Sequence, residues 1–178
     1  MSSNNSILIK LRNLSRRTKI ILVLVFVLLT WFYFSLPSKL FHAPTSFVIE
    51  DKDGNLLNAS IAEDGQWRFP YDPDVPDKFI KCITTFEDKR FYDHPGVDLF
   101  AMGRATIKNI KSGHAVQGGS NITMQVIRLS RHAERRNLWQ KLVESIEAVR
   151  MEFSYSKNEI MALYASNAPF GSNVVGLY

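Results

Sequence analysis

Residues 135–153 read RRNLWQKLVESIEAVRMEF and carry the clearest helix signal in the chain. Apolar side chains recur there every three or four positions, which is the spacing of one face of an α-helix. We expect this stripe to face the core, and we expect Glu144, about 200° around the helix from Leu142, to lie on the exposed polar side. The stripe consists of Leu138, Leu142, Ile146, Val149 and Phe153.

A second helix is predicted over residues 77–88, where apolar side chains again share one face. Its C-terminal end carries Glu87. Because this carboxylate follows an apolar helix and precedes Phe91, we expect it to be partly buried beside aromatic rings. Such burial would raise its pKa toward the range that is useful for proton transfer. The single cysteine, Cys82, is expected to be a buried apolar residue of this helix.

Three further helices make the predicted domain mainly α. Asp98 is expected to be the N-cap of a helix that stops at Gly113. Ser120 is expected to open the next helix, which runs through Arg131. The last predicted helix covers residues 157–166.

The segment before these helices, residues 45–76, is predicted to be a small β region followed by a proline-containing connector. Apolar runs on both sides of Asp53-Gly54 indicate a hairpin, and DGQWR at 64–68 is expected to continue it.

A transmembrane anchor is predicted at residues 20–36, which read IILVLVFVLLTWFYFSL and contain no charge. As a helix rising about 1.5 Å per residue, this run is just long enough to cross a hydrocarbon core of roughly 30 Å. Residues 1–19 carry basic side chains and are expected to be a cytoplasmic tail. A cleaved signal peptide is the alternative, and it is disfavoured by the length of the apolar run and the lack of an A-x-A site.

The formal net charge of +5 does not indicate a nucleic-acid-binding protein. The tail supplies this excess and the rest of the chain is balanced, so the basic character is local and a nucleic-acid-binding protein is disfavoured.

Two stretches contain candidate chemistry. In EDKRFYDHPGVD, residues 87–98, an Asp/His metal site is disfavoured because no second ligand cluster completes the shell. In QGGSNITMQ, residues 117–125, two glycines before a capping Ser120 would leave backbone N–H groups open to a phosphate or diphosphate. Glycines also commonly occur in turns before helices without binding anything, so the sequence alone does not decide whether this is an anion site. Nearby cations favour an anion site, and they are Arg128, Arg131, Arg136 and Lys141.

Carboxylates on separate elements, such as Glu87 and Glu144, suit acid-base chemistry at a sugar hydroxyl or glycosidic bond. The ordinary alternative for Glu144 is a solvated helical face.

Four motifs together resemble the glycosyltransferase family 51 domain, the peptidoglycan polymerase of class A penicillin-binding proteins, and most of all its 1C type. The resemblance covers about residues 45–178. The motifs are EDKRFYDHPGVD from 87, GGSNITMQVIRL from 118, KLVE from 141 and SKNEIMALYASNAPFG from 156.

The resemblance implies a lysozyme-like, mainly helical fold and the polymerisation of lipid II into β-1,4 glycan strands with release of undecaprenyl diphosphate. It makes Glu87 the general base and Glu144 a second essential carboxylate that orients the diphosphate, directly or through a divalent cation (Mg²⁺ or Mn²⁺). No organic cofactor is expected. The implied substrate-binding positions are Asp88, Phe91, His94, Arg104, Gly119, Ser120, Thr123, Gln125, Arg128, Arg136 and Lys141.

The implied partners are lipid II, the growing glycan strand, the cytoplasmic membrane and other cell-wall synthesis proteins. The catalytic domain, residues 77–178, would lie on the outer, periplasmic side of the bacterial inner membrane as part of a single-pass protein. Because the chain stops at Tyr178, we expect this domain to be incomplete at its C-terminus and the family's transpeptidase domain to be absent.

Three residues depart from the family pattern: Asn121 replaces Thr, Gln140 replaces Arg, and Ser166 replaces the Asn of the YLN pattern. The last change puts a structural or substrate contact in doubt. Two other functions stay open, a lysozyme-like hydrolase or lytic transglycosylase with Glu87 as acid, and an inactive lipid II-binding module.

Overall fold

The computed structural model describes residues 15–114, 118–131 and 137–177, and it forms two compact units that divide after Leu36. The first unit contains helix α2 (Arg16–Phe34), which has no buried residue and is long and apolar enough to cross a membrane. This helix begins before the predicted apolar segment because the Ser15 side chain accepts a hydrogen bond from the Thr18 N–H and caps it. A signal sequence would have the same length and composition, so that alternative stays open.

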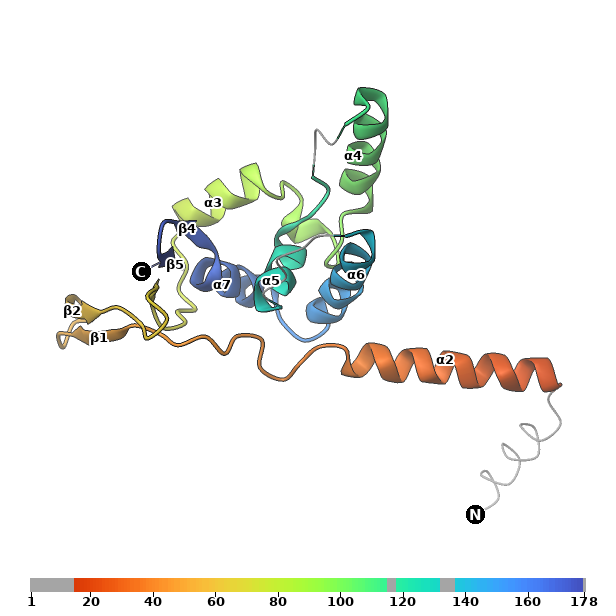
Figure 1. The fold of residues 1–178 in the computed structure, drawn as a ribbon, viewed down its shortest axis with the longest axis horizontal. Coiled ribbons are helices and arrows are strands. Elements are labelled where there is room, and N and C mark those ends of the chain that lie inside the picture. Colours follow the sequence, from red (N-terminus) through yellow and green to blue (C-terminus); the bar gives the residue numbers. More distant parts are fainter. Residues whose placement is uncertain (1–14, 115–117, 132–136, 178) are drawn as a thin grey trace, which may run out of the picture. The chain divides into compact units, whose positions relative to one another are not determined.

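The second unit is mainly helical, which confirms the predicted fold class (Figure 1). Its helices closely follow the predicted ranges, because the limits of a helix are set by capping residues that lie within a few positions of its ends. Asp98 caps α4 as predicted, and Gly113, with a φ of 70°, ends that helix. The helical elements are α3 (Asp77–Phe86), the short 3₁₀ turn η1 (Phe91–Asp93), α4 (Leu99–Ser112), α5 (Ile122–Ser130), α6 (Leu138–Glu152) and α7 (Lys157–Asn167).

Two small sheets accompany the helices. The predicted hairpin is confirmed, since β1 (Phe47–Glu50) pairs antiparallel with β2 (Leu56–Ser60). The third strand, β3 (Trp67–Arg68), does not continue this hairpin as predicted. It pairs in parallel with β5 (Val174–Val175), which pairs antiparallel with β4 (Pro169–Gly171). A sheet of this kind joins segments far apart in sequence, so local periodicity could not predict it.

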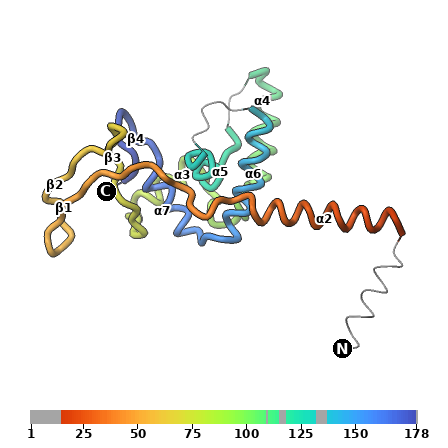
Figure 2. The backbone as a smooth tube through the Cα atoms, turned by 60° about the horizontal axis from the view of Figure 1, so that its bottom comes forward, coloured from red at the N-terminus to blue at the C-terminus, as the bar shows by residue number. Residues whose placement is uncertain are grey.

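Helix α5 forms the centre of the unit and packs against both α6 and α7 (Figure 2). Ile122, Val126 and Ile127 of α5 are almost completely buried. The N-cap of this helix is Asn121, whose side chain accepts from the Met124 N–H, and not Ser120 as predicted.

The predicted core stripe of α6 is wrong. Leu138 is 88% exposed and Phe153 is 76% exposed. The face of α6 that is buried contains Glu144 and Glu147 beside Ala148 and Met151. Periodicity identified the helix, but the position of α5 decides which face is covered.

Helix α3 lies at the surface and buries none of its residues completely. Cys82 is therefore exposed, and the expectation that it is a buried apolar residue is wrong.

Candidate active site

Glu87 is the C-cap residue of α3, and its side chain is exposed. The predicted burial beside aromatic rings is therefore wrong, because the surface position of α3 leaves neighbouring Phe86 83% exposed as well. The Glu87 carboxylate is nevertheless held in place: the Gln125 side-chain amide on α5 donates a hydrogen bond of 2.8 Å to its Oε2 atom. Two of the predicted site residues thus meet across two helices.

A pocket of about 180 Å³ lies beside Glu87, between the end of α3, the start of α4 and the loop before α5. It brings together residues that are distant in sequence and that the motif resemblance singled out. It also contains Lys89, which sequence reasoning passed over although it lies in the same motif. The lining includes Glu87, Asp88, Lys89, Arg104, Gly119 and Ser120.

The glycine pair of this loop, Gly118 and Gly119, forms part of the pocket lining. Among the described residues, the N–H groups of Gly118 and Gly119 make no hydrogen bond. A Cβ atom on Gly119 would lie 3.2 Å from the Cα of Met102 on α4, which is tighter than ordinary packing allows. Glycine therefore lets the loop approach α4 closely while its N–H groups stay open.

The N-terminus of α5 is not open to an external anion in the way that the sequence suggested. The Ile122 N–H lies 3.4 Å from Oδ2 of Asp88, and the Met124 N–H is bonded to Asn121. A carboxylate at a helix N-terminus is favourable because it meets the positive end of the helix dipole. Asp88 therefore occupies the position that was predicted for a phosphate.

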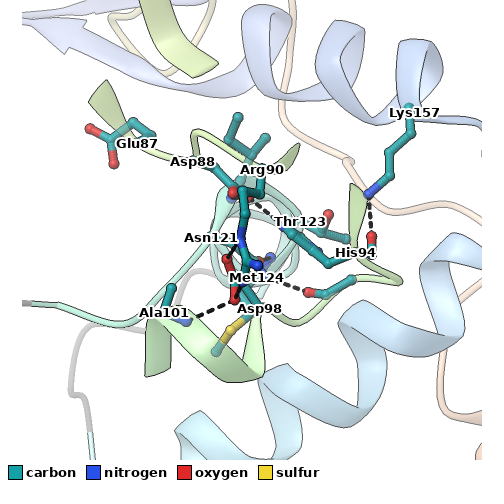
Figure 3. A network of polar contacts seen from close by, with 12 residues as sticks. Glu87, Asp88, Arg90, His94, Asp98, Ala101, Asn121, Thr123, Met124 and Lys157 are labelled. Atoms are coloured by element: carbon teal, nitrogen blue, oxygen red, sulfur yellow. Dashed lines mark hydrogen bonds and ion pairs between the residues drawn. The ribbon is translucent and has the colours of Figure 1, made fainter. Parts of the chain in front are cut away.

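Asp88 also forms a buried pair with His94, whose Nε2 lies 2.9 Å from the Asp88 Oδ2 (Figure 3). Lys157 donates to the backbone carbonyl of His94 at 2.7 Å, and Asn121 donates to the carbonyl of Gly96 at 2.7 Å. In Figure 3 the Glu87 carboxylate points away from these contacts. The network therefore fixes the loop that follows Glu87.

Two other predicted substrate-binding residues lie in the core. Phe91 is completely buried, with the Lys157 ammonium 4.5 Å from its ring centroid. Thr123 is completely buried and donates to Glu152 at 2.8 Å. Both side chains belong to the core of the domain, and neither lines the pocket beside Glu87.

Glu144 is only 2% exposed, which overturns the expectation of a solvated helical face. Its Oε2 atom is buried and has no hydrogen-bond partner among the described residues. The pocket beside Glu87 includes neither Glu144 nor Lys141, which is half-buried on the same helix. Arg136 lies outside the described residues.

One turn further along α6, Glu147 forms an ion pair with Arg131. Burial raises the pKa of Glu147, the charge and hydrogen bond of Arg131 lower it, and the nearby Glu144 raises it. Sequence reasoning missed Glu147 and counted Arg131 among the anion-binding cations. In the structure this guanidinium is already paired.

Tyr164 on α7 is a further neighbour of Glu87 that sequence reasoning missed. Burial raises the pKa of Tyr164, the negative charge of Glu87 raises it further, and the positive charge of Arg128 lowers it. Tyr164 therefore lies within electrostatic reach of two predicted site residues. Its place in the fourth motif, in ALYAS, was the available signal.

Comparisons with known sequences identify relatives of this chain. A model of the family described as Transglycosylase matches residues 53–178. Penicillin-binding protein 1C from Escherichia coli (strain K12) is 34% identical over 142 residues, which cover 79% of this chain and 18% of that protein. Penicillin-binding protein 1A/1B from Bacillus subtilis (strain 168) is 33% identical over 145 residues, or 80% of this chain and 15% of that protein. The chain thus spans less than a fifth of these two curated relatives.

Proposed function

Because the chain belongs to the transglycosylase family, we propose that it is a peptidoglycan glycosyltransferase that polymerises lipid II into β-1,4 glycan strands. The observation that carries this proposal is the exposed Glu87 carboxylate, which Gln125 orients at the edge of a pocket lined with cations and open backbone donors. The transmembrane helix α2 would hold the enzyme at the membrane, with the catalytic domain on the outer side.

In this mechanism Glu87 accepts the proton of the acceptor sugar's 4-hydroxyl while that oxygen attacks the anomeric carbon of the donor. A new C–O bond forms as the bond to the lipid diphosphate breaks, with inversion at the anomeric carbon. An exposed carboxylate can reach a substrate hydroxyl directly, and the hydrogen bond from Gln125 limits its rotation.

Negative charge develops on the diphosphate as it leaves. Hydrogen-bond donors and cations that are already in position before the reaction stabilise this charge. Lys89, Arg104 and the N–H groups of Gly118 and Gly119 are the groups in the pocket that would do this. Arg128 on α5 lies within electrostatic reach of Tyr164, as Glu87 does.

A divalent cation fits Glu144 in one respect, since its buried Oε2 has no partner among the described residues. Mg²⁺ in phosphate enzymes is commonly held by one or two carboxylates together with substrate oxygens. When bound, such an ion would neutralise negative charge, and Glu144 would be a single ligand, because the described residues contain no group of three or more His, Cys, Asp or Glu side chains that could hold a metal ion. The pocket beside Glu87 does not include Glu144, so no step of the reaction is assigned to an ion.

The proposal is tested by incubating the purified full chain with lipid II and separating the products by length. The wild type is expected to form long glycan strands. Glu87→Gln is expected to lower the rate by about 10²–10⁴-fold, because general-base catalysis contributes that much. Glu63→Gln, an exposed carboxylate outside the pocket, is the control and should leave the rate unchanged.

Two results would contradict the proposal. Shortening of preformed glycan without chain growth would indicate a hydrolase or lytic transglycosylase. Binding of lipid II by the wild type and by Glu87→Gln alike, without polymerisation, would indicate a binding module.

A further inference from the structure

A second pocket, of about 330 Å³, lies away from Glu87 and is not used by the proposed reaction. It is formed by the segment at residues 38–45, by the end of β3 with the residues after it, and by α7. Its volume is within the range of small-molecule sites. Aromatic rings form much of its wall, and they belong to Phe41, Phe69, Tyr71 and Tyr155.

The wall also contains a hydroxyl group without a hydrogen-bond partner among the described residues. Ser166 is 7% exposed, lines the pocket, and its hydroxyl makes no hydrogen bond among the described residues. The hydroxyl oxygen does not belong to the buried atoms without a partner among the described residues, so it is open to the pocket and can bond a ligand or water. Serine replaces asparagine of the family pattern at this position, and the shorter side chain leaves more space.

Two cations lie on the same wall. Arg68 is anchored through Nη1, which donates to the Pro44 carbonyl at 2.7 Å and to Asp64 at 2.8 Å. Its Nε and Nη2 groups make no hydrogen bond among the described residues. Because Asp64 compensates Arg68, the uncompensated charge belongs to Lys39, which forms no ion pair within the described part of the chain.

The pocket therefore combines a net positive charge, unused N–H and O–H donors, and aromatic walls. This chemistry suits an anion that carries an apolar body. Ser38 and Lys39 follow the end of α2 so closely that the intervening peptide spans at most roughly 15–20 Å. A membrane that held α2 would thus bring lipid headgroups within reach of these residues.

We propose that this pocket binds the phosphate headgroup of an anionic membrane phospholipid. The proposal rests on α2 crossing a membrane, as the proposed function requires. Lys39 supplies the charge, Ser166 and the unused Arg68 N–H groups bond the phosphate oxygens, and the aromatic rings contact the glycerol and the first methylene groups. Basic pockets between the helices of membrane proteins bind anionic lipid headgroups through the same kind of charge and hydrogen-bond contacts.

The test is native mass spectrometry of the full chain in detergent, titrated with phosphatidylglycerol and, separately, with zwitterionic phosphatidylcholine. We expect the wild type to prefer phosphatidylglycerol. Lys39→Gln should weaken that binding by about tenfold, since a hydrogen bond to a charged group is lost. Ser166→Leu, which fills the pocket, should weaken it as well. Lys52→Gln, in the turn of the hairpin, is the matched control and should have no effect.

Equal binding of the two lipids, or unchanged binding by Lys39→Gln, would overturn the proposal. Lys39 is exposed, so its variant is expected to fold even where Ser166→Leu does not. Two further measurements identify the source of the phosphate: competition by inorganic phosphate, and binding of a prenyl diphosphate. If millimolar inorganic phosphate displaces the lipid completely, the pocket is a free-anion site. If Lys39→Gln weakens binding of farnesyl diphosphate but not of phosphatidylglycerol, the site serves a prenyl diphosphate. Lipid binding is measured without lipid II, so this outcome is independent of polymerisation.

Discussion

The same side chain has very different surroundings at three positions of this domain: Glu87, Glu144 and Glu147. Glu87 is exposed and oriented by one amide, whereas the two glutamates of α6 are buried. Arg131 compensates Glu147, but the Oε2 atom of Glu144 has no partner in the described part of the chain. Burial of two carboxylates one turn apart is costly, and a function at the site gives a reason for it.

Glu147 predicts a pH-dependent stability. Burial raises its pKa in the folded chain, so the folded state holds more protons than the unfolded state between the two pKa values. Its contribution to stability is complete below the unfolded pKa and declines as the pH rises through the folded pKa. Glu147→Gln removes this titration and keeps an acceptor for Arg131. The melting temperature of the variant relative to wild type should therefore rise as the pH increases above the unfolded pKa of Glu147.

Glu159→Gln is the control with the opposite sign. Hydrogen bonds from the Ser156 backbone and side chain lower the pKa of Glu159, so its contribution is present above the unfolded pKa and is lost as the pH falls. As the pH rises, the relative melting temperature of this variant should fall until the pH reaches the unfolded pKa of Glu159 and stay level above it. Parallel curves for the two variants would contradict both assignments.

Among the structural elements, α5 and α6 both begin with an asparagine cap, but the two caps have different surroundings. Asn121 is buried, accepts from the Met124 N–H and donates to the Gly96 carbonyl. Asn137 is exposed and belongs to a capping box with Gln140. The cap of α5 thus joins the helix to the loop after Glu87, whereas the cap of α6 acts locally.

This difference predicts unequal effects of one substitution. Aspartate is as good an N-cap as asparagine, so Asn137→Asp should change the free energy of unfolding by less than about 0.5 kcal/mol. Asn121→Asp should destabilise the chain by about 2 kcal/mol or more, because a buried carboxylate would face the Gly96 carbonyl and lie close to Asp88. Chemical denaturation of both variants measures this, and equal losses would show that the bond to Gly96 contributes nothing.

At the scale of the whole molecule, residues 37–178 contain their own core and form a compact unit separate from α2. We therefore expect a chain that lacks residues 1–36 to keep its helical circular dichroism and to melt within about 3 °C of the full chain. It should pellet with phospholipid vesicles less than the full chain does. A loss of cooperative melting would show that residues 1–36 are part of the fold.

Sequence by itself determined the elements of this protein. The helix limits follow from Asp98, Gly113 and Ser156, because caps act on the backbone within a few residues. The apolar segment and the order of four motifs were also readable, because each is a local pattern. The candidate residues beside Glu87 came from those motifs.

Tertiary structure alone decided which surfaces are buried. Three of the five stripe residues of α6, Leu138, Leu142 and Phe153, are exposed while Glu144 is buried, because α5 packs against the other side of the helix. The N-terminus of α5 receives Asp88 from a distant loop, and Arg131 meets Glu147 across two helices. These contacts join residues far apart in the chain, and periodicity describes only the element in which a residue lies. The environment of each carboxylate therefore followed from packing and could not be derived from its position in the sequence.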